Sequence, residues 1–324
     1  MEIDFKRESG FWDEFLIENN GSFLQSFEWG NFQEKLGKKV WRMEVKNGQK
    51  VLLEAQVIKE KIFFKNYFYV PYGPVFGSDN SREENLSAFE LLLKNIRELA
   101  EKEEVFFLRI EPVSLLPETS RFSFRKTDRR VQPGKTLILD IDKPEGELLM
   151  SFKKRARYNI RLAEKKGVGI KILDKYSGVF YKLLGKTKER QEFRSYPEEH
   201  YKQIMETEGK DFKARIFLAE FQGKPVVATL AIFFGNKVTT LHTGFDYCQR
   251  ALKAPYLVRW KVISEGKKLG KRECDFWGID EKKWPGVTSL KKSFGGREVE
   301  YGKGLEFVFN PVWFFLYNIL RKIL

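Results

Sequence analysis

The chain has 324 residues, of which 42% are hydrophobic and 15% aromatic, so it is long enough for two folded domains and too apolar for an intrinsically disordered protein. Its formal net charge of +14 at pH 7 favours an anionic partner such as a nucleic acid, a nucleotide or a membrane surface. The two cysteines, Cys248 and Cys274, form no CxxC pair, which argues against a zinc site.

The N-terminal segment is polar and lacks an apolar signal core, and no run of about eighteen apolar residues is present. We therefore expect a cytoplasmic protein. In that reducing compartment the two cysteines are expected to be small buried hydrophobes without a disulfide.

The first half predicts a helix after Ser22, which is a suitable N-cap. Apolar runs on either side of Asn47-Gly48 predict a hairpin, and the next strand must end at residues 71–74 because Pro74 has no amide to donate. An amphipathic helix is expected over residues 80–103. Buried strands are expected over residues 105–112 and 132–141.

A single helix is expected over residues 151–167, with Asp142 as N-cap, Pro144 in the first turn and Gly167 at the stop. One face is apolar, and the other carries Lys154, Arg157, Arg161 and Lys165. Such a face is either a solvated charged surface or a surface that meets phosphates. Its scarcity of acids favours phosphates.

The order of elements then recurs. A helical region over residues 178–208 precedes a hairpin at Gln222-Gly223, a strand ending near Gly244, a helix over 254–269 and the strand ECDFWGI. Gly223 follows Gly48 by 175 residues, and the later strands keep a similar interval. A constant offset with matched order predicts a tandem duplication of two α/β domains with mixed sheets, over residues 1–150 and 151–305, linked by the basic helix.

The final segment, residues 306–324, predicts an amphipathic helix that ends in Arg321 and Lys322. Two interpretations stay open. The helix docks on its own domain, or it lies on the membrane interface with its basic residues toward anionic lipid.

The chain contains only two histidines, His200 and His242, and no GxSxG motif, which argues against a histidine-dependent hydrolase. His242 is expected on a strand, where it could line a cleft. The segment SLKKSFGG, residues 289–296, is either a solvated turn or a constrained loop that aims a lysine at developing negative charge. Gly167-Val168-Gly169 is a weak acyl-CoA signal, and Leu252 stands where that site would need a glycine.

Taken together, these segments resemble the Fem family of peptidoglycan-bridge aminoacyltransferases, in its compact branch without a coiled-coil arm. The resemblance covers nearly the whole chain and is carried by these segments in this order: FLQSFEWGNFQEKLG, YVPYGPVF, FLRIEP, KKRARYNIRLAEKKGV, GKPVVATLAIFF with HTG, APYLVRW with CDFWGI, and SLKKSFGGREVEY. It implies two GNAT-like acyltransferase domains. It also implies transfer of an amino acid from aminoacyl-tRNA to an amine of a nucleotide-linked or lipid-linked muropeptide.

The resemblance also implies site residues. Lys291 matches the catalytic-site lysine, with Lys292 as the fallback if the register slips, and Glu111 stands where relatives have an acid near the acceptor. Arg194 and Tyr201 match precursor-binding residues. Phe106 replaces a tyrosine that relatives place before the acid. Near Trp29, where relatives carry a ligand-binding lysine, this chain has Asn31, and Lys35 lies one turn further on.

The main hypothesis is thus a cytoplasmic aminoacyltransferase that uses aminoacyl-tRNA as co-substrate and needs no metal or redox cofactor. Lys291 and Glu111 would serve catalysis. Substrate binding would fall to Arg194, Tyr201, Lys154, Arg157, Arg161, His242 and Lys35. The alternatives are a GNAT-type N-acyltransferase with an acyl-thioester donor and a non-enzymatic RNA-binding module. A monomer is favoured, and peripheral contact with the inner membrane face stays open as an alternative.

Overall fold

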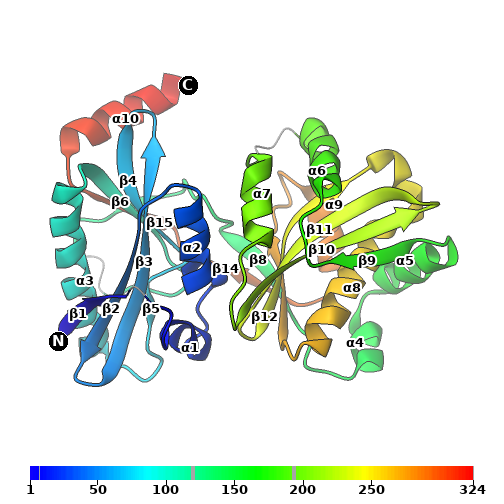
Figure 1. Cartoon of the computed structure of the whole chain (residues 1–324), viewed down its shortest axis with the longest axis horizontal. Helices are drawn as coiled ribbons and strands as arrows, with labels where there is room; N and C mark the ends of the chain where they lie inside the picture. The colour runs from blue at the N-terminus through cyan, green and yellow to red at the C-terminus, as the bar shows by residue number, and fades with distance from the viewer. Residues whose placement is uncertain (7, 118–120, 192–194, 324) are drawn as a thin grey trace. The chain divides into compact units, whose positions relative to one another are not determined.

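The computed structural model describes residues 1–6, 8–117, 121–191 and 195–323. The chain forms two compact units (Figure 1). Unit 1 comprises Met1–Gly134 together with Tyr301–Leu324, and unit 2 comprises Lys135–Glu300. Each unit is built on its own mixed sheet with helices on both faces, which is the α/β organisation expected from the sequence.

Unit 1 contains a sheet in the order β1-β2-β3-β4-β6-β15-β7, with β5 paired to β3. Helix α3 covers one face, and α1 and α2 cover the other (Figure 1). The strands are β1 (Glu2–Phe5), β2 (Val40–Asn47), β3 (Lys50–Ile62), β4 (Lys65–Pro71), β5 (Val75–Phe76), β6 (Val105–Glu111), β7 (Arg125–Thr127) and β15 (Gly304–Val308). The helices are α1 (Trp12–Glu18), α2 (Phe27–Lys35), α3 (Arg82–Lys102) and α10 (Pro311–Ile323).

The local signals of unit 1 act largely as expected. Gly48 adopts φ +60° in the β2–β3 turn, which a residue with a side chain rarely does. Ser81 and Glu84 form a reciprocal capping box at the start of α3. Ser22, however, caps only the short 3-10 helix Phe23–Gln25, and Ser26 caps α2 through the amide of Trp29.

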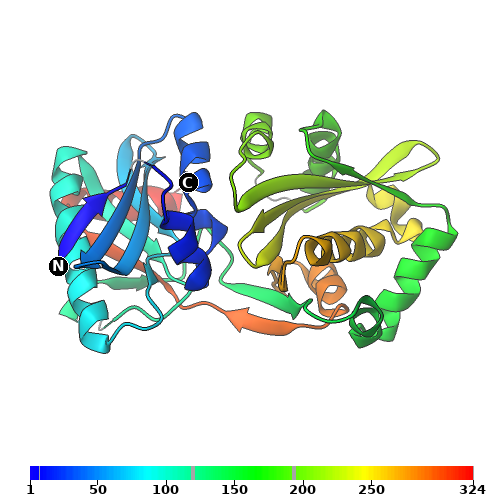
Figure 2. The same ribbon diagram turned by 60° about the horizontal axis from the view of Figure 1, so that its bottom comes forward.

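Unit 2 contains a sheet in the order β14-β8-β13-β12-β11-β10-β9. Figure 2 shows α6 and α7 on one face and α8 on the other. The strands are β8 (Lys135–Asp140), β9 (Gly169–Leu173), β10 (Phe212–Phe221), β11 (Lys224–Phe234), β12 (Lys237–Phe245), β13 (Glu273–Gly278) and β14 (Arg297–Glu300). The helices are α4 (Glu145–Ser151), α5 (Lys154–Lys165), α6 (Gly178–Gln191), α7 (Glu198–Met205), α8 (Ala254–Lys268) and α9 (Pro285–Lys292).

The two sheets repeat one pairing scheme, as the duplication predicted. In unit 1, β2, β3 and β4 are antiparallel neighbours and β6 is parallel to β4; in unit 2, β10, β11, β12 and β13 repeat this pattern. The helix between the parallel strands is α3 in one unit and α8 in the other. Such a parallel pair requires a long crossover, which each helix supplies.

The units are not contiguous halves of the sequence. Strand β8 follows the first half along the chain but pairs with β13 and β14, whereas β15 comes after unit 2 and pairs with β6 and β7. Unit 2 is thus one continuous segment that begins with β8, whereas the chain returns to unit 1 through β15. The structural division falls at residues 134/135 and 300/301, rather than at the sequence-based boundaries of 150 and 305.

The expected single basic helix is two helices, and it belongs to unit 2 instead of linking the halves. The break falls at Phe152 and Lys153, where Phe152 adopts an extended backbone and buries its ring. Asp142 is not an N-cap, because α4 begins at Glu145 after Pro144. Gly167 ends α5 as predicted: it has φ +81°, and the amide of Val168 returns to the carbonyl of Ala163.

Glycine in the LHTG segment of β12 is required by packing. A Cβ on Gly244 would lie 2.4 Å from the backbone nitrogen of Leu184 and 2.5 Å from the carbonyl carbon of Leu183 in α6. Helix α6 can therefore lie against β12 only because this position has no side chain.

We predict that Gly244→Ala lowers the free energy of unfolding by about 2–4 kcal/mol, because the helix must move away from the strand. The matched control is Gly185→Ala within α6, where an added Cβ meets nothing within 4 Å. That change should raise stability by roughly 0.5–1 kcal/mol. Urea unfolding of the full-length variants measures both changes, and equal stability of the two variants would contradict the packing argument.

Candidate active site

The parallel strands of unit 2 stop pairing halfway along. Strands β12 and β13 are in register from Lys237 with Glu273 to Thr239 with Asp275, and no pair follows. Beyond that point Trp277 adopts φ +60°, a strained conformation for a bulky residue. The Asp275 carboxylate holds this bend, because its Oδ1 accepts from the Trp277 amide at 2.7 Å and from the Thr136 hydroxyl.

The bend gives Lys291 its partners. The side chain of Lys291 is 7% exposed in the last turn of α9, and its Nζ donates to the carbonyl of Gly278 at 2.5 Å and that of Trp277 at 3.4 Å. The neighbouring Lys292 faces outward and pairs with Glu281 and Glu298. The structure thus distinguishes the two lysines of SLKKSFGG that the sequence left as alternatives.

Helix α9 is anchored at both ends. The Thr288 hydroxyl donates to the Asp280 carbonyl and accepts from the Asp280 amide, both at 3.0 Å. After the helix, Gly295 and Gly296 adopt φ +81° and +96°, and a Cβ on Gly296 would lie 2.6 Å from the Ile138 carbonyl oxygen. The paired glycines therefore let the chain pass against β8, which fixes α9 and the lysine that it carries.

Burial dominates the electrostatics around Lys291. It lowers the pKa of the lysine to about 7, the neighbouring Arg259 cation acts in the same direction, and Asp275 opposes them. Arg259 is also buried, which lowers its pKa to about 10, and its Nε has no hydrogen-bond partner among the described residues. Two buried basic groups, Lys291 and Arg259, therefore lie close enough to affect one another, an arrangement that favours an anion.

His242 and Tyr201 come together beside this site. His242 lies on β12 beyond the last β12–β13 pair, and burial together with the Lys291 cation lowers its pKa to about 4. Its ring is 5.6 Å from that of Tyr201 in α7, with the planes near perpendicular. Tyr196 stacks on His200 at 3.9 Å and approaches His242 at 6.4 Å. Arg194 lies outside the described residues.

The basic face of α5 is present but not uniform. Lys154 and Arg161 are exposed, as expected for a surface that meets anions. Arg157 instead donates through Nη1 to the carbonyls of Met150 and Phe152, so it ties the end of α4 to α5. On the other face Ala156, Ile160 and Ala163 are buried.

A cationic pocket that sequence reasoning missed lies between α5 and α9. Its volume is about 380 Å³, and Arg155 donates across it to the Ser289 hydroxyl at 3.2 Å. The lining residues are Lys153, Arg155, Glu281, Pro285, Thr288, Ser289, Lys292 and Ser293. The cationic run at residues 153–155 was the available signal, but its pairing with α9 depends on the fold.

Glu111 and Lys35 belong to unit 1. Glu111 is fully buried, and its carboxylate accepts from the amides of Val131 and Gln132 at 2.6 and 2.9 Å and from the Tyr69 hydroxyl at 2.9 Å. Phe106, which replaces the tyrosine of relatives, has no hydroxyl, and the hydroxyl that donates to Glu111 is that of Tyr69 in the adjacent strand β4. Lys35 is exposed in the last turn of α2.

Leu252, on which the steric argument against acyl-CoA rests, has a buried side chain. It packs in the core of unit 2. The next residue, Lys253, adopts φ +58° before α8 begins. Within the part of the chain that the structure describes, no group of three or more His, Cys, Asp or Glu side chains is placed to hold a metal ion.

Comparison with known proteins places these features in a family. The model of the FemAB family matches residues 9–126, 121–224 and 213–322. The lipid II:glycine glycyltransferase of Staphylococcus aureus strain USA300 is 26% identical over 301 residues, covering 88% of this chain and 67% of that protein. The protein of the same name from strain MRSA252 is 27% identical over 310 residues, covering 90% and 69%.

Solved structures share the fold. The crystal structure of FemX matches with a TM-score of 0.82 at 20% identity, covering 98% of this chain and 99% of that chain. A tandem GNAT protein from the clavulanic acid biosynthesis pathway matches with a TM-score of 0.59 at 13% identity, covering 96% and 99%. The fold is thus a tandem of GNAT-like units, and since the family model matches nearly its whole length, this chain belongs to the FemAB family.

Proposed function

We propose that this protein transfers an amino acid from aminoacyl-tRNA to an amine of a peptidoglycan precursor. The observation that carries the proposal is Lys291, buried on an anchored helix at the point where β12 and β13 cease to pair, in a chain of the FemAB family. The S. aureus relatives are named as glycyltransferases that use lipid II. A muropeptide acceptor for this chain follows from that likeness.

The chemistry needs little more than charge and position. The acceptor amine attacks the ester carbonyl, a C–N bond forms, the C–O bond to the ribose breaks, and one amine proton ends on the ribose hydroxyl. An aminoacyl ester is already activated, so no enzyme nucleophile is required. The Lys291 ammonium donates to the developing oxyanion, and neutral His242 beside it adds no competing charge.

A pKa near 7 suits Lys291 to proton transfer as well. At neutral pH both of its forms are populated, so the ammonium can protonate the departing ribose oxygen and the resulting amine can accept the proton that the acceptor loses. One residue then serves as oxyanion donor and proton carrier. The carbonyls of Trp277 and Gly278, which accept hydrogen bonds from Lys291 in this structure, keep its side chain in place between these steps.

We assign the binding of the aminoacyl-tRNA donor to unit 2, because this unit carries a group of cationic side chains. Lys154 and Arg161 on α5, with Lys153 and Arg155 at the pocket beside α9, provide a surface for the phosphates of the tRNA acceptor end. We retain Tyr201 and His242 as lining residues for the transferred group. Arg157 is assigned a structural role, because its guanidinium is already engaged by the end of α4.

Glu111 is assigned a positioning role in unit 1. Two of its three hydrogen bonds order residues 131–132, immediately before the chain enters unit 2. A direct role in orienting the acceptor amine would require exchange of one of these bonds. We further propose that the reaction occurs in the cytoplasm, without a metal or redox cofactor, and that Lys35 contributes to precursor binding.

The deciding experiment supplies a pool of tRNAs charged with labelled amino acids and offers nucleotide-linked and lipid-linked precursors in parallel. Label on either precursor supports the proposal and names the donor and acceptor. Label on neither, together with measurable acyl-CoA binding, would favour the thioester-dependent N-acyltransferase. Digestion of the tRNA before the assay is the control and should abolish transfer.

We predict that Lys291→Ala lowers kcat by about 10²–10³-fold, because it removes the donor to the oxyanion. The affinity for charged tRNA should be unchanged, since the Nζ of Lys291 is buried and not part of the phosphate surface. The matched control is Lys292→Ala, which should keep activity within about threefold of the wild type. Equal activity of the two variants would contradict the catalytic role of Lys291.

A second prediction needs no substrate. The pKa of Lys291 is lowered to about 7 in the folded state from 10.5, so burial of its ammonium destabilises the fold at and below pH 7, and stability recovers as pH rises toward 10.5. Lys291→Met should therefore be more stable than the wild type by about 2–4 kcal/mol at pH 6.5, with most of the gain gone at pH 9.5.

Lys292→Met is the control for this measurement, because its ammonium is partly exposed and paired with two carboxylates. It should show no such gain at either pH. Chemical unfolding at the two pH values measures the effect. A Lys291→Met advantage that does not change with pH would show that the lysine is not buried as an ammonium below pH 7.

A further inference from the structure

Helix α10 is apolar on two opposite sides. Phe314 and Tyr317 are 4% and 3% exposed and pack on Tyr67, Tyr69, Phe106 and Phe107 of the unit 1 sheet. The opposite side, at helical spacing, remains in solvent: Val312 is 67% exposed, Phe315 65%, Leu316 39% and Ile319 41%. A helix that buries only one of two apolar faces normally has a second partner.

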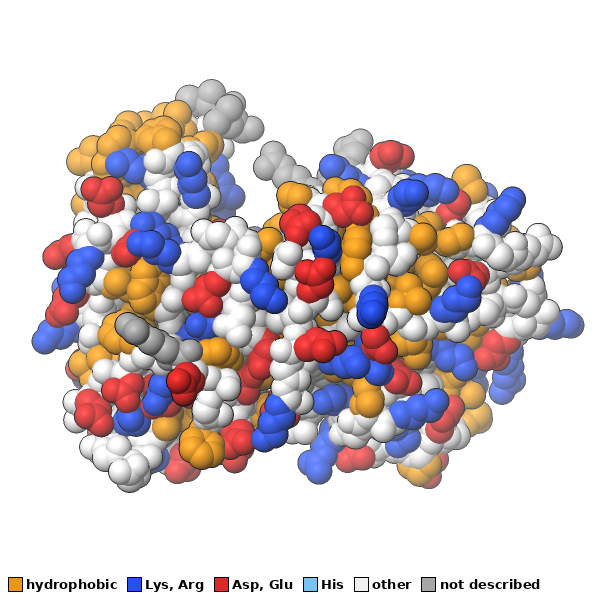
Figure 3. Space-filling model, viewed as in Figure 1, with side chains coloured by type: hydrophobic (Ala, Val, Ile, Leu, Met, Phe, Trp, Pro, Cys, Tyr) orange, Lys and Arg blue, Asp and Glu red, His pale blue; other side chains and the backbone are white. Residues whose placement is uncertain are grey.

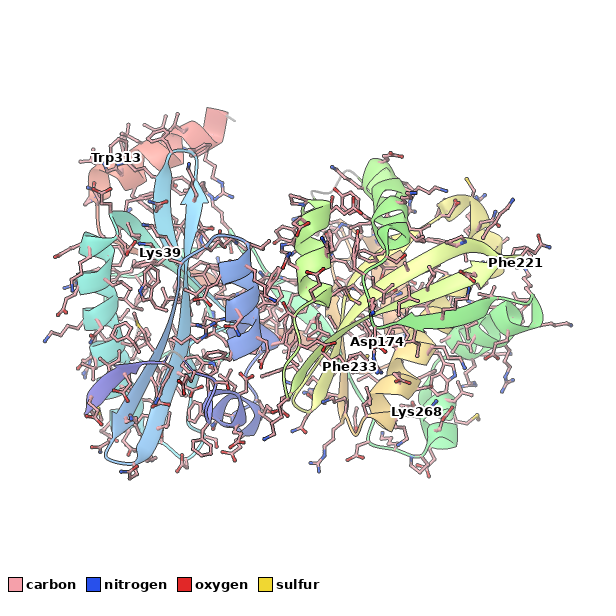
Figure 4. All side chains as sticks on the ribbon, in the orientation of Figure 1. Lys39, Asp174, Phe221, Phe233, Lys268 and Trp313 are labelled. Carbon is pink, nitrogen blue, oxygen red and sulfur yellow. The ribbon has the colours of Figure 1, made fainter. Side chains whose placement is uncertain are left out.

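The hairpin between β3 and β4 extends this surface. Phe63 and Phe64 at its tip are 41% and 63% exposed. The Phe64 ring meets Trp313 at 5.8 Å, and the Phe63 ring meets Tyr317 at 6.4 Å. Figure 3 shows apolar side chains gathered over α10, and Figure 4 places Trp313 on that helix. We define the apolar surface as Phe63, Phe64, Val312, Phe315, Leu316 and Ile319.

The surroundings of this surface are cationic. Lys65 lies 4.2 Å from the centre of the Trp313 ring, and Arg321 and Lys322 are exposed in the last turn of the helix. Neither residues 61–66 nor residues 311–323 contain an aspartate or glutamate. Long basic side chains beside exposed aromatic rings are the combination found in helices that lie in the interface of anionic bilayers.

We propose that unit 1 docks on an anionic lipid surface through this apolar surface, with α10 lying in the plane of the interface. The positive charge around this surface favours an anionic membrane over a second copy of the protein. A second copy paired through the same surface would set cations against cations, with no aspartate or glutamate in residues 61–66 or 311–323 to offset them. No helix among the described residues is long and apolar enough to cross a membrane, so the contact is peripheral.

Docking also favours one acceptor. Insofar as the proposed function holds, a protein held at the membrane meets a lipid-linked precursor in two dimensions and gains effective concentration for it over a nucleotide-linked one in solution. The docking itself does not depend on the donor, the acceptor or catalysis.

The test is co-sedimentation of the full-length protein with vesicles of phosphatidylcholine alone and with 30% phosphatidylglycerol, at about 0.05 and 0.5 M NaCl. The protein should bind the anionic vesicles, and its affinity for them should be lower at the higher NaCl concentration. The variant Phe64→Gln/Phe315→Gln should lose about tenfold or more in affinity for them.

The matched control is Phe5→Gln/Phe11→Gln, which replaces two other phenylalanines of unit 1, 48% and 80% exposed. Its vesicle affinity should equal that of the wild type, and both variants should keep the wild-type unfolding midpoint. Absence of binding in the wild type would overturn the proposal, as would equal losses in the two variants. A dimer that Phe64→Gln/Phe315→Gln dissociates would assign the surface to self-association instead.

Activity separates this proposal from the proposed function. Phe64→Gln/Phe315→Gln should keep its rate on a nucleotide-linked precursor and lose rate only on a lipid-linked precursor in vesicles. If the wild type transfers to neither acceptor but still binds vesicles through this surface, the docking stands and the proposed function fails.

Discussion

The site depends on one carboxylate that holds one strained peptide. Asp275 is buried, which raises its pKa, yet it accepts from the amide of Trp277 and the hydroxyl of Thr136. These bonds offset a left-handed backbone at Trp277 that costs about 1–3 kcal/mol. Past that bend, β13 pairs with β8 again at Gly278 but no longer with β12, and the carbonyls of Trp277 and Gly278 accept from Lys291.

Burying an ammonium costs free energy, so the structure must keep the side chain of Lys291 from turning out into solvent. The packing of the residues around α9 does this. Phe294 is fully buried against Phe152 and Phe276, and the glycines after it allow contact with β8 that no side chain would permit. Strand β8 opens unit 2, whereas α9 lies near its end. The two ends of this unit therefore meet to hold Lys291.

The sequence predicted what is local. Hairpins at Gly48 and Gly223 and the stop at Gly167 are each set by a few neighbouring residues, and all are present. The sequence-based predictions failed where contacts between residues far apart in the sequence determine the local structure. Phe152 breaks the basic helix because its ring is needed beside Trp260 and Phe294, and Tyr69 reaches Glu111 only because β4 and β6 are neighbours. Lys291 was found by resemblance, whereas its separation from Lys292 required the fold.

The duplicated units differ most where chemistry is expected. In unit 2, pairing of the parallel strands ends at Asp275, and a lysine occupies the space beyond. In unit 1, the equivalent strands β4 and β6 remain paired as far as Pro71 with Glu111. There the hydroxyl of Tyr69 donates to the carboxylate of Glu111. The buried lysine at the end of the parallel pair thus belongs to unit 2, whereas the sheet of unit 1 carries α10 and its exposed apolar surface.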